Sequence, residues 1–573
     1  MELRHSWKNG APFANTKSLL PHGLHWHAGA AFRAPREFGK CEPHACSDPP
    51  RRMSHANRQI DAHLQYGRRL HGAGRLAEAG QVYQQVLAAA PLHADALDMM
   101  GVLLLQMGQP AQALPWFQQA IRIKGTVADF HVHHAHALLA LGRAAEAATA
   151  SRTALRLKRG NAEAHQVLGR ALTETADYAG ALKEFQDAVR LKPDLLDGLN
   201  DLGTALHHAN RLEEAARTLA RAVAREPKEP GILLNLSSVL KSLGRFEEAE
   251  NRLTAALRLA PADPRILYNY SLLMLLLGRF AAAWPGWEQR FRAGAVPDRG
   301  LAGPIWRGEK LAGRTLLVHA EQGLGDTIQF CRFPLPTDGA VVLEVQPRIA
   351  RLLGSLRGAP RIVRAGETSP AFDLTCPLMS LPVILGTTLN SVPHDVPYLS
   401  AEPDAVTRWR TRLGDGGFRV GIAWQGNPTR REDGGRSIPL EHYLPLASVP
   451  DVRLVSLQKD DGEEQLAPGM TVETLGDDFD SGPDGFIDTA AVMMNLDLVI
   501  TSDTAIAHLA GALGRPVWVA LRAVPDWRWL LERTDSPWYP TMRLFRQSAR
   551  DEWGPVFMAM RDALAALVAA RHG

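Results

Sequence analysis

An alanine recurs every 34 residues through the first half of this 573-residue chain. The seven alanines share one phase of the repeat: Ala79, Ala113, Ala147, Ala181, Ala215, Ala249 and Ala283. Three of them end the phrase Gly-Arg-x-x-Glu-Ala, which begins at Gly74, Gly142 and Gly244. Self-similarity at this period is typical of stacked helical units, each of which buries its apolar face only against its neighbours. The pattern therefore predicts a solenoid of helix pairs over residues 56–292.

Two further phases of the repeat carry small and large side chains. The small ones are Gly67, Gly101, Ala135, Gly169, Gly203, Ser237 and Ser271. The large ones are Tyr83, Phe117, Phe185, Leu219, Leu253 and Trp287, with Ser151 as the exception. Small residues let two helices approach closely, and large ones fill the space beside them. A 34-residue helix-turn-helix unit of this kind resembles the tetratricopeptide repeat, and seven units fit. The resemblance implies a superhelix whose concave groove binds a protein or peptide.

Asp201, Asn235 and Asn269 share a phase in the first helix of three successive units. The resemblance places this column on the concave surface, where asparagine side chains can hydrogen-bond an extended peptide backbone. The alternative is that asparagine is simply common at this position and points to solvent.

The composition argues against several classes of protein. The formal net charge of +3 argues against a dedicated nucleic-acid binder, which would carry a strong basic excess. Four cysteines in so long a chain indicate no disulfide framework and favour a reducing, cytoplasmic compartment. The sequence lacks a run of about eighteen uncharged apolar residues, so no membrane span is expected, whereas peripheral contact with a membrane stays open.

Residues 1–55 have no sustained hydrophobic period and are expected to form a disordered extension. Cys41, His44 and Cys46 lie close together, but their spacing matches none of the usual zinc pairs and no second pair follows. We therefore predict no metal site in this segment. Met53 directly precedes the first periodic segment and is an alternative start of translation.

Downstream of the repeats, short β-prone runs alternate with helical segments. A first half, 298–400, has expected strands at 315–320, 340–345, 361–364 and 372–374. A second half, 417–573, has expected strands at 419–424, 453–458, 471–475, 496–500, 517–521 and 542–545, and a closing helix over 553–570. Two such halves predict two doubly wound α/β domains that face each other across a cleft.

Two strand-to-helix corners in these halves carry polar residues. After the first expected strand, Gly323, Gly325 and Asp326 form a tight turn where a ligand can approach the backbone. After the strand at 496–500, the segment Thr501-Ser502-Asp503 offers helix caps, and Thr504 and His508 lie one helical turn apart. A helix N-terminus at the carboxyl edge of a parallel sheet is a common phosphate site.

The two corners resemble the signatures of the heptosyltransferase-like glycosyltransferases of family 9. The resemblance rests on Gly323-Leu324-Gly325-Asp326 and on Asp503-Thr504 with His508 before Leu513-Gly514-Arg515-Pro516. With the repeats upstream and Asp526-Trp527-Arg528-Trp529 downstream, the chain is similar to bacterial repeat-containing glycosyltransferase-like proteins. The implied fold class is an α-solenoid followed by an α/β GT-B module with two Rossmann-like halves.

The resemblance also implies roles for these residues. Asp326 would be the base that deprotonates the acceptor hydroxyl, and the alternative is that it only caps its helix. Thr504 and His508 would bind the donor diphosphate, although a lone buried histidine is more often part of the core. Asp503 is expected to cap the helix or to accept from a donor hydroxyl. Gly323 and Gly325 would let the donor approach the backbone.

Further donor contacts are expected in the second half. Arg436 matches a basic donor-binding position of the family, and its alternative is a solvated side chain. Gln425 and Asn427 follow the first strand of this half, and Gln458 and Lys459 follow the next, with less support. The segment Asp478-Phe479-Asp480 resembles the metal motif of the other large glycosyltransferase fold. Because it lies in a Gly- and Asp-rich stretch, we predict a loop and no metal.

Three functions fit these features. The first is an inverting, metal-independent glycosyltransferase that uses an ADP- or UDP-linked sugar and takes a protein or glycan acceptor recruited by the repeats. The second is a non-catalytic scaffold with a degenerate GT-B module, which the shortness of the first half favours. The third is an O-GlcNAc-type protein glycosyltransferase. The presence of Asp326, Arg436, Thr504 and His508 together favours activity.

Overall fold

The computed structural model describes residues 55–358, 360–426, 435–467 and 469–572. The predicted N-terminal extension, with Cys41, His44, Cys46 and Met53, lies outside the described residues, as does Asn427. The chain divides into two compact units, Met1–Val239 and Leu240–Gly573. The boundary falls inside the repeats, so the last helix pairs belong to the same unit as the α/β halves.

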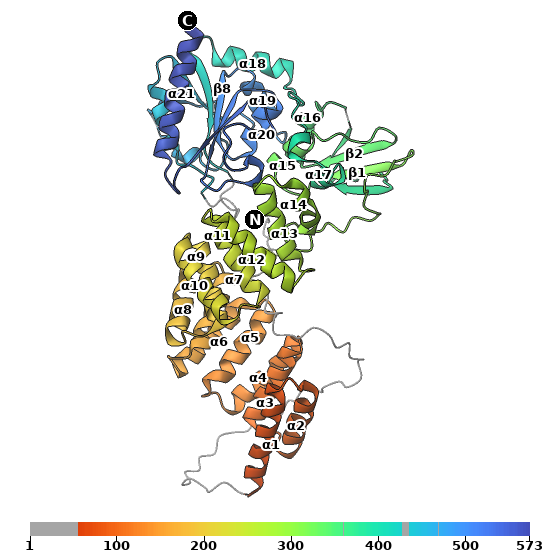
Figure 1. Cartoon of the computed structure of the whole chain (residues 1–573), viewed down its shortest axis with the longest axis vertical. Coiled ribbons are helices and arrows are strands. Elements are labelled where there is room, and N and C mark those ends of the chain that lie inside the picture. Colours follow the sequence, from red (N-terminus) through yellow and green to blue (C-terminus); the bar gives the residue numbers. More distant parts are fainter. Residues whose placement is uncertain (1–54, 359, 427–434, 468, 573) are drawn as a thin grey trace. The chain divides into compact units, whose positions relative to one another are not determined.

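The repeat region forms seven helix pairs within the described residues (Figure 1). The helices are α1 (His55–Gly72), α2 (Leu76–Ala89), α3 (Ala94–Gln106), α4 (Pro110–Ile123), α5 (Ala128–Ala140), α6 (Ala144–Leu157), α7 (Ala162–Glu174), α8 (Tyr178–Leu191), α9 (Leu196–His208), α10 (Leu212–Arg225), α11 (Pro230–Ser242), α12 (Phe246–Leu259), α13 (Pro264–Leu276) and α14 (Phe280–Trp287). None of the helices in the described part of the chain is long and apolar enough to cross a membrane.

The first position of the Gly-Arg-x-x-Glu-Ala phrase lies at the turn between the two helices of each pair. The residues there have positive φ: Gly74, Gly108, Gly142, Ala176, Asn210, Gly244 and Gly278. The five glycines have φ between 71° and 76°, a conformation in which a Cβ is unfavourable. The adjoining Arg-x-x-Glu forms a bidentate ion pair, as between Arg143 and Glu146, whose two N···O distances are both 2.7 Å. The phrase thus encodes the turn and the start of the second helix.

The small and large phases meet inside one helix pair. A Cβ placed on Gly101 would lie 2.6 Å from Cε1 of Phe117, and one on Gly169 would lie 2.6 Å from Cε1 of Phe185. Both phenylalanines are fully buried. The prediction that small residues admit a close neighbour is therefore confirmed at these positions.

Phe117→Ala is expected to lower the free energy of unfolding of the repeats by about 3–5 kcal/mol, because it leaves a cavity opposite Gly101. Chemical denaturation followed by circular dichroism of the helices measures this. Met107→Ala, at a side chain that is 41% exposed beside the same helix pair, is the control and should cost less than about 0.5 kcal/mol. Equal losses in the two variants would contradict the packing described here.

The unit Leu240–Gly573 contains two parallel sheets. The strands of the smaller sheet are β1 (Thr315–His319), β2 (Ala340–Val345), β3 (Arg361–Arg364) and β4 (Leu374–Pro377), in the order β3-β2-β1-β4. Those of the larger sheet are β5 (Phe418–Ala423), β6 (Val452–Ser456), β7 (Val472–Glu473), β8 (Leu498–Ser502), β9 (Val517–Leu521) and β10 (Met542–Arg546), in the order β10-β9-β8-β5-β6-β7. All pairings between these strands are parallel. The predicted α/β character of this region is confirmed.

Helices cover both faces of the larger sheet. The helices of the two α/β halves are α15 (Leu324–Phe330), α16 (Ala350–Leu353), α17 (Leu381–Ile384), α18 (Pro403–Leu413), α19 (Ile487–Met493), α20 (Ala505–Ala512) and α21 (Gly554–His572). In Figure 1, α21 lies on one side of this sheet and α19 and α20 on the other. Coverage on both faces explains why β8 and β9 are buried at every residue.

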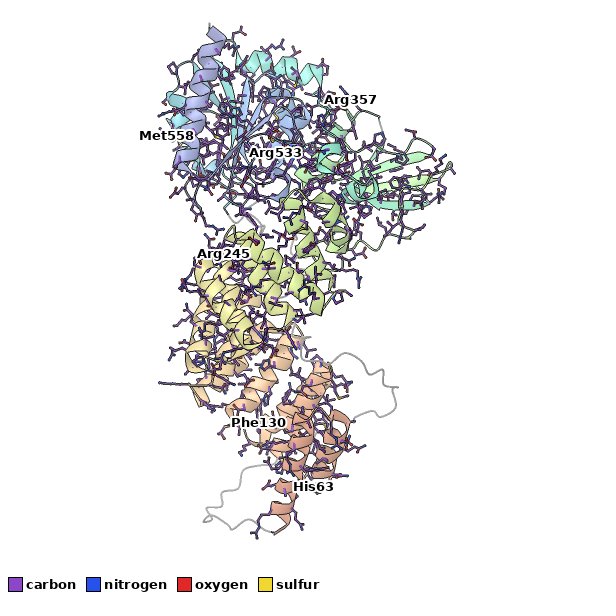
Figure 2. All side chains as sticks on the ribbon, viewed as in Figure 1. His63, Phe130, Arg245, Arg357, Arg533 and Met558 are labelled. Atoms are coloured by element: carbon purple, nitrogen blue, oxygen red, sulfur yellow. The ribbon has the colours of Figure 1, made fainter. Side chains whose placement is uncertain are left out.

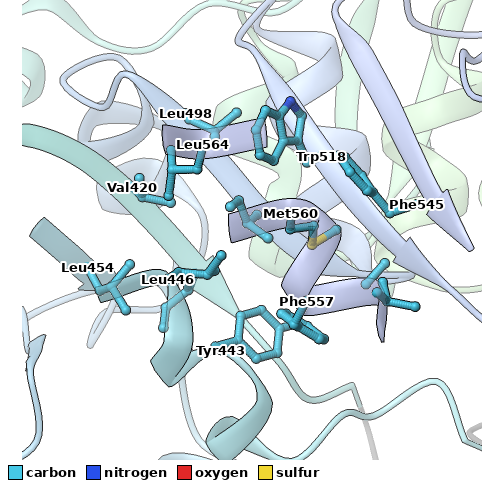
Figure 3. Packing of buried hydrophobic residues seen from close by; sticks show 14 of the residues in the cluster. Val420, Tyr443, Leu446, Leu454, Leu498, Trp518, Phe545, Phe557, Met560 and Leu564 are labelled. Atoms are coloured by element: carbon cyan, nitrogen blue, oxygen red, sulfur yellow. The ribbon is translucent and has the colours of Figure 1, made fainter. Parts of the chain in front are cut away.

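The core under α21 is built from alternate residues of the strands. Figure 3 shows Phe557, Met560 and Leu564 of α21 against Val420 and Leu498. On the outer side of the helix, Met558 is 41% exposed (Figure 2). This amphipathic arrangement is what the helical period over 553–570 predicted.

Several expected strand boundaries are wrong: β4 begins at Leu374, where the strand expected at 372–374 ends, and β6 ends at Ser456 instead of residue 458. The strand predicted at 496–500 is β8, which begins at Leu498 and continues through Thr501 and Ser502. Both residues are fully buried. Thr501 pairs with β5 and β9 and Ser502 pairs with β9, so they do not serve as helix caps. The N-cap of α20 is Thr504 rather than Asp503.

The last repeat is hydrogen-bonded to the first α/β half. The indole Nε1 of Trp284 donates to the carbonyl oxygen of Thr387 over 2.6 Å, and Nε1 of Trp287 donates to that of Met379 over 2.8 Å. Just beyond α14, the short helix η2 (Glu288–Arg290) carries Arg290, which is fully buried.

The Arg290 guanidinium contacts Glu321, in the segment that links β1 to α15. Nη2 lies 3.0 Å from Oε1 of Glu321, Nη1 lies 2.8 Å from Oε1 of Glu288, and Nη2 donates to Oγ of Ser380 over 2.7 Å. We call Arg290, Glu288, Glu321 and Ser380 the junction cluster. It joins the end of the repeats to the turn that carries Gly323 and Asp326.

Candidate functional site

A cavity of about 400 Å³ is lined by residues that follow β1, β5, β6 and β8. The order of each sheet reverses beside its first strand, and a crevice at the carboxyl ends of the strands is expected at such a point. The lining includes every predicted cleft residue that the structure describes: Gly323, Gly325, Asp326, Gln425, Arg436, Gln458, Asp503, Thr504 and His508. The residues come from both α/β halves.

Gly325 lets the two halves approach each other at this cavity. A Cβ placed on it would lie 3.0 Å from Cδ2 of His508 and 3.3 Å from Cα of Ala505. The contact joins α15 to α20, so any side chain at position 325 would push the two helices apart. The glycine predicted as a ligand contact therefore also has a packing role.

Asp326 caps its helix and lines the cavity at the same time. Its Oδ2 accepts from the backbone N–H of Gly323 over 2.8 Å, and its Oδ1 accepts from Nη2 of Arg528. The side chain is 20% exposed. A carboxylate has about four lone-pair sites, so these two bonds leave acceptor capacity toward the cavity. Both interpretations of Asp326 from the sequence are compatible with this placement.

Arg528, on the short helix η10 (Trp527–Trp529), is the central cation of the site and was not among the predicted residues. Its Nε donates to Oε1 of Gln329 over 2.7 Å, and its Nη1 lies 2.8 Å from Oδ1 of Asp526. Burial acts against its charge, but the carboxylates of Asp526 and Asp326 outweigh this and raise the pKa of Arg528 above its usual value. The only sequence signal was the phrase Asp526-Trp527-Arg528-Trp529, an arginine between large apolar side chains.

His508 is a satisfied buried histidine that also faces the cavity. It is 5% exposed, its Nδ1 lies 3.0 Å from the hydroxyl of Tyr539, and its ring stacks on that of Trp529 at 5.3 Å. Burial, reinforced by Arg528, lowers the pKa of His508 well below its usual value, so the ring is neutral at physiological pH. With the Tyr539 hydroxyl as donor to Nδ1, the proton is on Nε2, where it can be donated to a ligand.

Asp503 and Asp526 have pKa values shifted in opposite directions. Burial, and then repulsion from Asp526, raise the pKa of Asp503 above its usual range, although Arg436 opposes this. Burial acts to raise the pKa of Asp526 as well, but Arg528 outweighs it and lowers that pKa. Thr504 provides the first turn of α20, and its hydroxyl lies 3.1 Å from that of Thr501.

The side chain of Gln458 forms hydrogen bonds with the backbone of the protein. Its Oε1 accepts from the backbone N–H groups of Trp424 and Gln425, both over 3.0 Å. Its Nε2 donates to the carbonyl oxygen of Asp461 over 2.7 Å. Gln458 therefore holds the end of β5 in place while it lines the cavity, and the direct donor contact expected of it stays a prediction.

Arg436 is held beside the end of β5. The hydroxyl of its neighbour Ser437 accepts from the backbone N–H of Gly426 over 3.2 Å. The Nε atom of Arg436 is buried and has no hydrogen-bond partner among the described residues. The Arg436 side chain lines the cavity, so its guanidinium places a positive charge beside any anionic ligand bound there. Arg348 and Lys459 also line the cavity.

The three residues predicted to line the peptide groove form hydrogen bonds with other residues of the repeats. Asp201 is 5% exposed and accepts from Nε2 of Gln166 over 2.8 Å and from Nε of Arg170 over 2.6 Å. Nδ2 of Asn235 donates to Oδ1 of Asn200 over 2.8 Å. Nδ2 of Asn269 donates to the carbonyl oxygen of Arg265 in its own helix over 2.9 Å. Peptide recognition by this column stays a prediction.

Comparison with known proteins identifies the repeats. Two tetratricopeptide-repeat family models match the chain, one over residues 70–137 and 172–233 and the other over residues 133–195 and 234–298. The N-terminal region therefore consists of tetratricopeptide repeats, as the 34-residue period predicted.

Protein FlbA of Caulobacter vibrioides is 28% identical over 312 residues, which cover 49% of this chain and 52% of that protein. The chain thus spans about half the length of the curated relative that it matches.

Among solved structures, PilF of Pseudomonas aeruginosa has a TM-score of 0.32 at 20% identity and covers 35% of this chain and 90% of its own. TTC0263 of Thermus thermophilus, described as a thermophilic TPR protein, has a TM-score of 0.29 at 23% identity. The match covers 32% of this chain and 99% of TTC0263.

Proposed function

We propose that the cavity binds a nucleoside-diphosphate sugar and that the protein transfers the sugar to a protein or glycan acceptor recruited by its repeats. The observation that carries this proposal is that Asp326 of the first half and Thr504 and His508 of the second line one cavity. Two facing Rossmann-like halves, each with its cavity residues at the carboxyl ends of its strands, support a GT-B arrangement of this module.

The second half offers the groups that a diphosphate needs. Thr504, Ala505 and Ile506 form the start of α20 and line the cavity. The first N–H groups of a helix have no partner within the helix and lie at the positive end of its dipole. Arg436 adds a fixed positive charge, and Nε2 of His508 adds a neutral donor. These groups would stabilise the negative charge that builds up on the leaving diphosphate.

The first half offers the base. The acceptor hydroxyl would give its proton to Asp326 while its oxygen attacks the anomeric carbon of the sugar. The bond from that carbon to the phosphate oxygen breaks, and the electron pair leaves with the diphosphate. Attack from the side opposite the leaving group inverts the anomeric centre. Arg528 would hold the Asp326 carboxylate in position for this step.

A non-catalytic interaction scaffold is the second candidate. The repeats themselves support it, since tetratricopeptide units typically bind protein partners. Two contacts also favour it: the carboxylate oxygens of Asp326 already accept from Gly323 and from Arg528, which makes this group less ready to take a proton.

Turnover of nucleotide sugars separates the two candidates. The full chain is incubated with ADP- and UDP-linked sugars, and free nucleoside diphosphate is measured with water alone and with a pool of peptides as acceptors. We expect release above background, and Arg436→Ala should lower kcat/KM by about 10- to 100-fold because a charged hydrogen bond to the diphosphate is lost. Arg561→Ala, which removes an arginine paired with Asp562 on α21, is the matched control.

Equal turnover in Arg436→Ala and the wild type would contradict the role of the cavity. Absence of turnover with every donor would favour the scaffold.

A further inference from the structure

Phe486 has a backbone conformation that a bulky residue rarely adopts. It is the N-cap residue of α19 with φ 66° and ψ 2°, in the left-handed region. A residue of this size held there costs on the order of 1–3 kcal/mol, whereas glycine would adopt it freely. The strain indicates that the aromatic ring itself serves a purpose at this position.

Asp480 holds Phe486 in this conformation. Its side chain is buried, and its Oδ2 accepts from the backbone N–H of Phe486 over 3.0 Å. Its Oδ1 accepts from the backbone N–H of Asp488 over 2.9 Å. The other acidic residue of the predicted loop, Asp478, forms an ion pair with Arg412 at 2.7 Å. The loop thus uses its carboxylates to fix its own shape and to present Phe486.

Phe486 lies at the cavity together with a cation from the other half. Phe486, Asp480 and Thr489 line the cavity, and so does Arg348, which belongs to the first half. A Cβ placed on Gly485, the residue before Phe486, would lie 2.9 Å from Nε of Arg348. Nη1 of Arg348 also lies 3.6 Å from Oδ2 of Asp460 in the second half. The Arg348 guanidinium therefore lies against the backbone just before Phe486, and the two residues line the same cavity from opposite halves.

We propose that Phe486 and Arg348 form the nucleobase-binding end of the cavity, with the base stacked on the Phe486 ring and the Arg348 guanidinium beside it. This inference rests on the proposed function and adds the part of the donor that these residues recognise. Bases stack on aromatic faces and on guanidinium planes, and such stacking tolerates any base because every base has a π-face. The diphosphate then extends toward the start of α20, and the base links the two halves.

Binding of free ligands tests the inference without any need for turnover. The full chain and its variants are titrated by calorimetry with ADP, UDP and inorganic pyrophosphate. Phe486→Gly removes the ring and fits the left-handed backbone, so the fold should be retained, which thermal unfolding checks. We expect it to weaken ADP and UDP binding by about 10- to 100-fold and to leave pyrophosphate binding unchanged.

Matched variants control for backbone and charge. Phe486→Tyr keeps an aromatic face and should bind like the wild type. Ala312→Gly makes the same backbone change at an exposed residue with φ 52° outside the cavity and should have no effect. Arg348→Met should weaken ADP and UDP binding, whereas Arg357→Met, at an exposed arginine of the same half (Figure 2), should not.

Unchanged ADP and UDP affinity in Phe486→Gly would overturn the inference, as would an equal loss of affinity for pyrophosphate. Binding of pyrophosphate by the wild type without binding of either nucleotide would also overturn it and would leave the diphosphate site in place. Binding of none of the three ligands by the wild type would overturn the proposed function, and the inference with it.

Discussion

Asp326→Asn is expected to lower the rate of sugar transfer by about 100- to 10,000-fold, because the amide has no basic oxygen that can take the acceptor proton. Nucleoside-diphosphate binding should change little, since the groups assigned to the diphosphate lie in the second half. The amide oxygen can still accept from one of the two donors that now contact the carboxylate, Gly323 and Arg528. Release of nucleoside diphosphate at saturating donor measures the effect on kcat.

Asp535→Asn is the matched control for this variant. Asp535 also forms an ion pair with an arginine, Arg533, at 2.6 Å, but it does not line the cavity. It should turn over at the wild-type rate. Wild-type turnover in Asp326→Asn would contradict the assignment of the base and would leave the donor site untouched.

Arg290→Met is expected to destabilise the unit Leu240–Gly573 by about 3–5 kcal/mol, because it leaves the buried carboxylate of Glu321 without its cation. The side chains of Arg290 and Glu321 are 0% and 2% exposed, so water cannot replace the lost contact. Chemical denaturation measures the loss. Arg292→Met, at an exposed neighbour whose guanidinium contacts only Gln289 among the described residues, is the control.

The cost of Arg290→Met should grow with pH. Burial raises the pKa of Glu321 from 4.5 to about 7, with Arg290 opposing the shift. A carboxyl whose folded pKa lies above its unfolded value stabilises the fold below the unfolded pKa, and that contribution is lost as pH rises through the folded pKa. Without Arg290 the folded pKa rises further, so the variant should lose more stability at about pH 8.5 than at about pH 5.5.

A second substitution checks the cause of this pH dependence. Arg290→Met combined with Glu321→Gln removes the charge that has lost its partner, and it should recover stability at about pH 8.5 relative to Arg290→Met alone. A loss of stability that is equal at both pH values would show that Arg290 acts by packing rather than by charge.

Most of the fold could be predicted because the apolar and small residues of the sequence recur at periods that are typical of helices, strands and helical repeats. The 34-residue phases specify which residues meet in a helix pair, as Gly101 and Phe117 do. The β-prone runs specify the strands, and β9 spans the predicted residues Val517–Leu521. The start of β8 was placed too early, because Leu496 is apolar and buried like the strand residues although Asp497 separates it from them. The hydrophobic pattern of a segment therefore predicts whether it is a helix or a strand more securely than it predicts the residues at which the element begins and ends.

The cavity was only partly predictable. Residues at strand-to-helix corners, such as Asp326 and Thr504, could be found because the corner is a local feature of the sequence. Arg348, Phe486 and Arg528 belong to segments that tertiary folding brings to the cavity, and of the three only Arg528 lies in a phrase that the sequence singles out.

Gln458 illustrates this limit at a single residue. It stands at the end of a strand, where a ligand contact is expected, and its amide hydrogen-bonds the backbone at the end of β5. Residue type and position cannot separate these two uses, because the same donors and acceptors serve a ligand or the protein. The partners of a polar side chain become known only with the fold.

The central claim is that the cavity between the two α/β halves binds a nucleoside-diphosphate sugar. Calorimetric titration of the full chain with ADP- and UDP-linked sugars, repeated in the presence of the free nucleoside diphosphate, tests it most directly. We expect saturable binding of at least one donor at a single site, with competition by the matching free nucleotide. Absence of binding for both donors and for free ADP and UDP would contradict it.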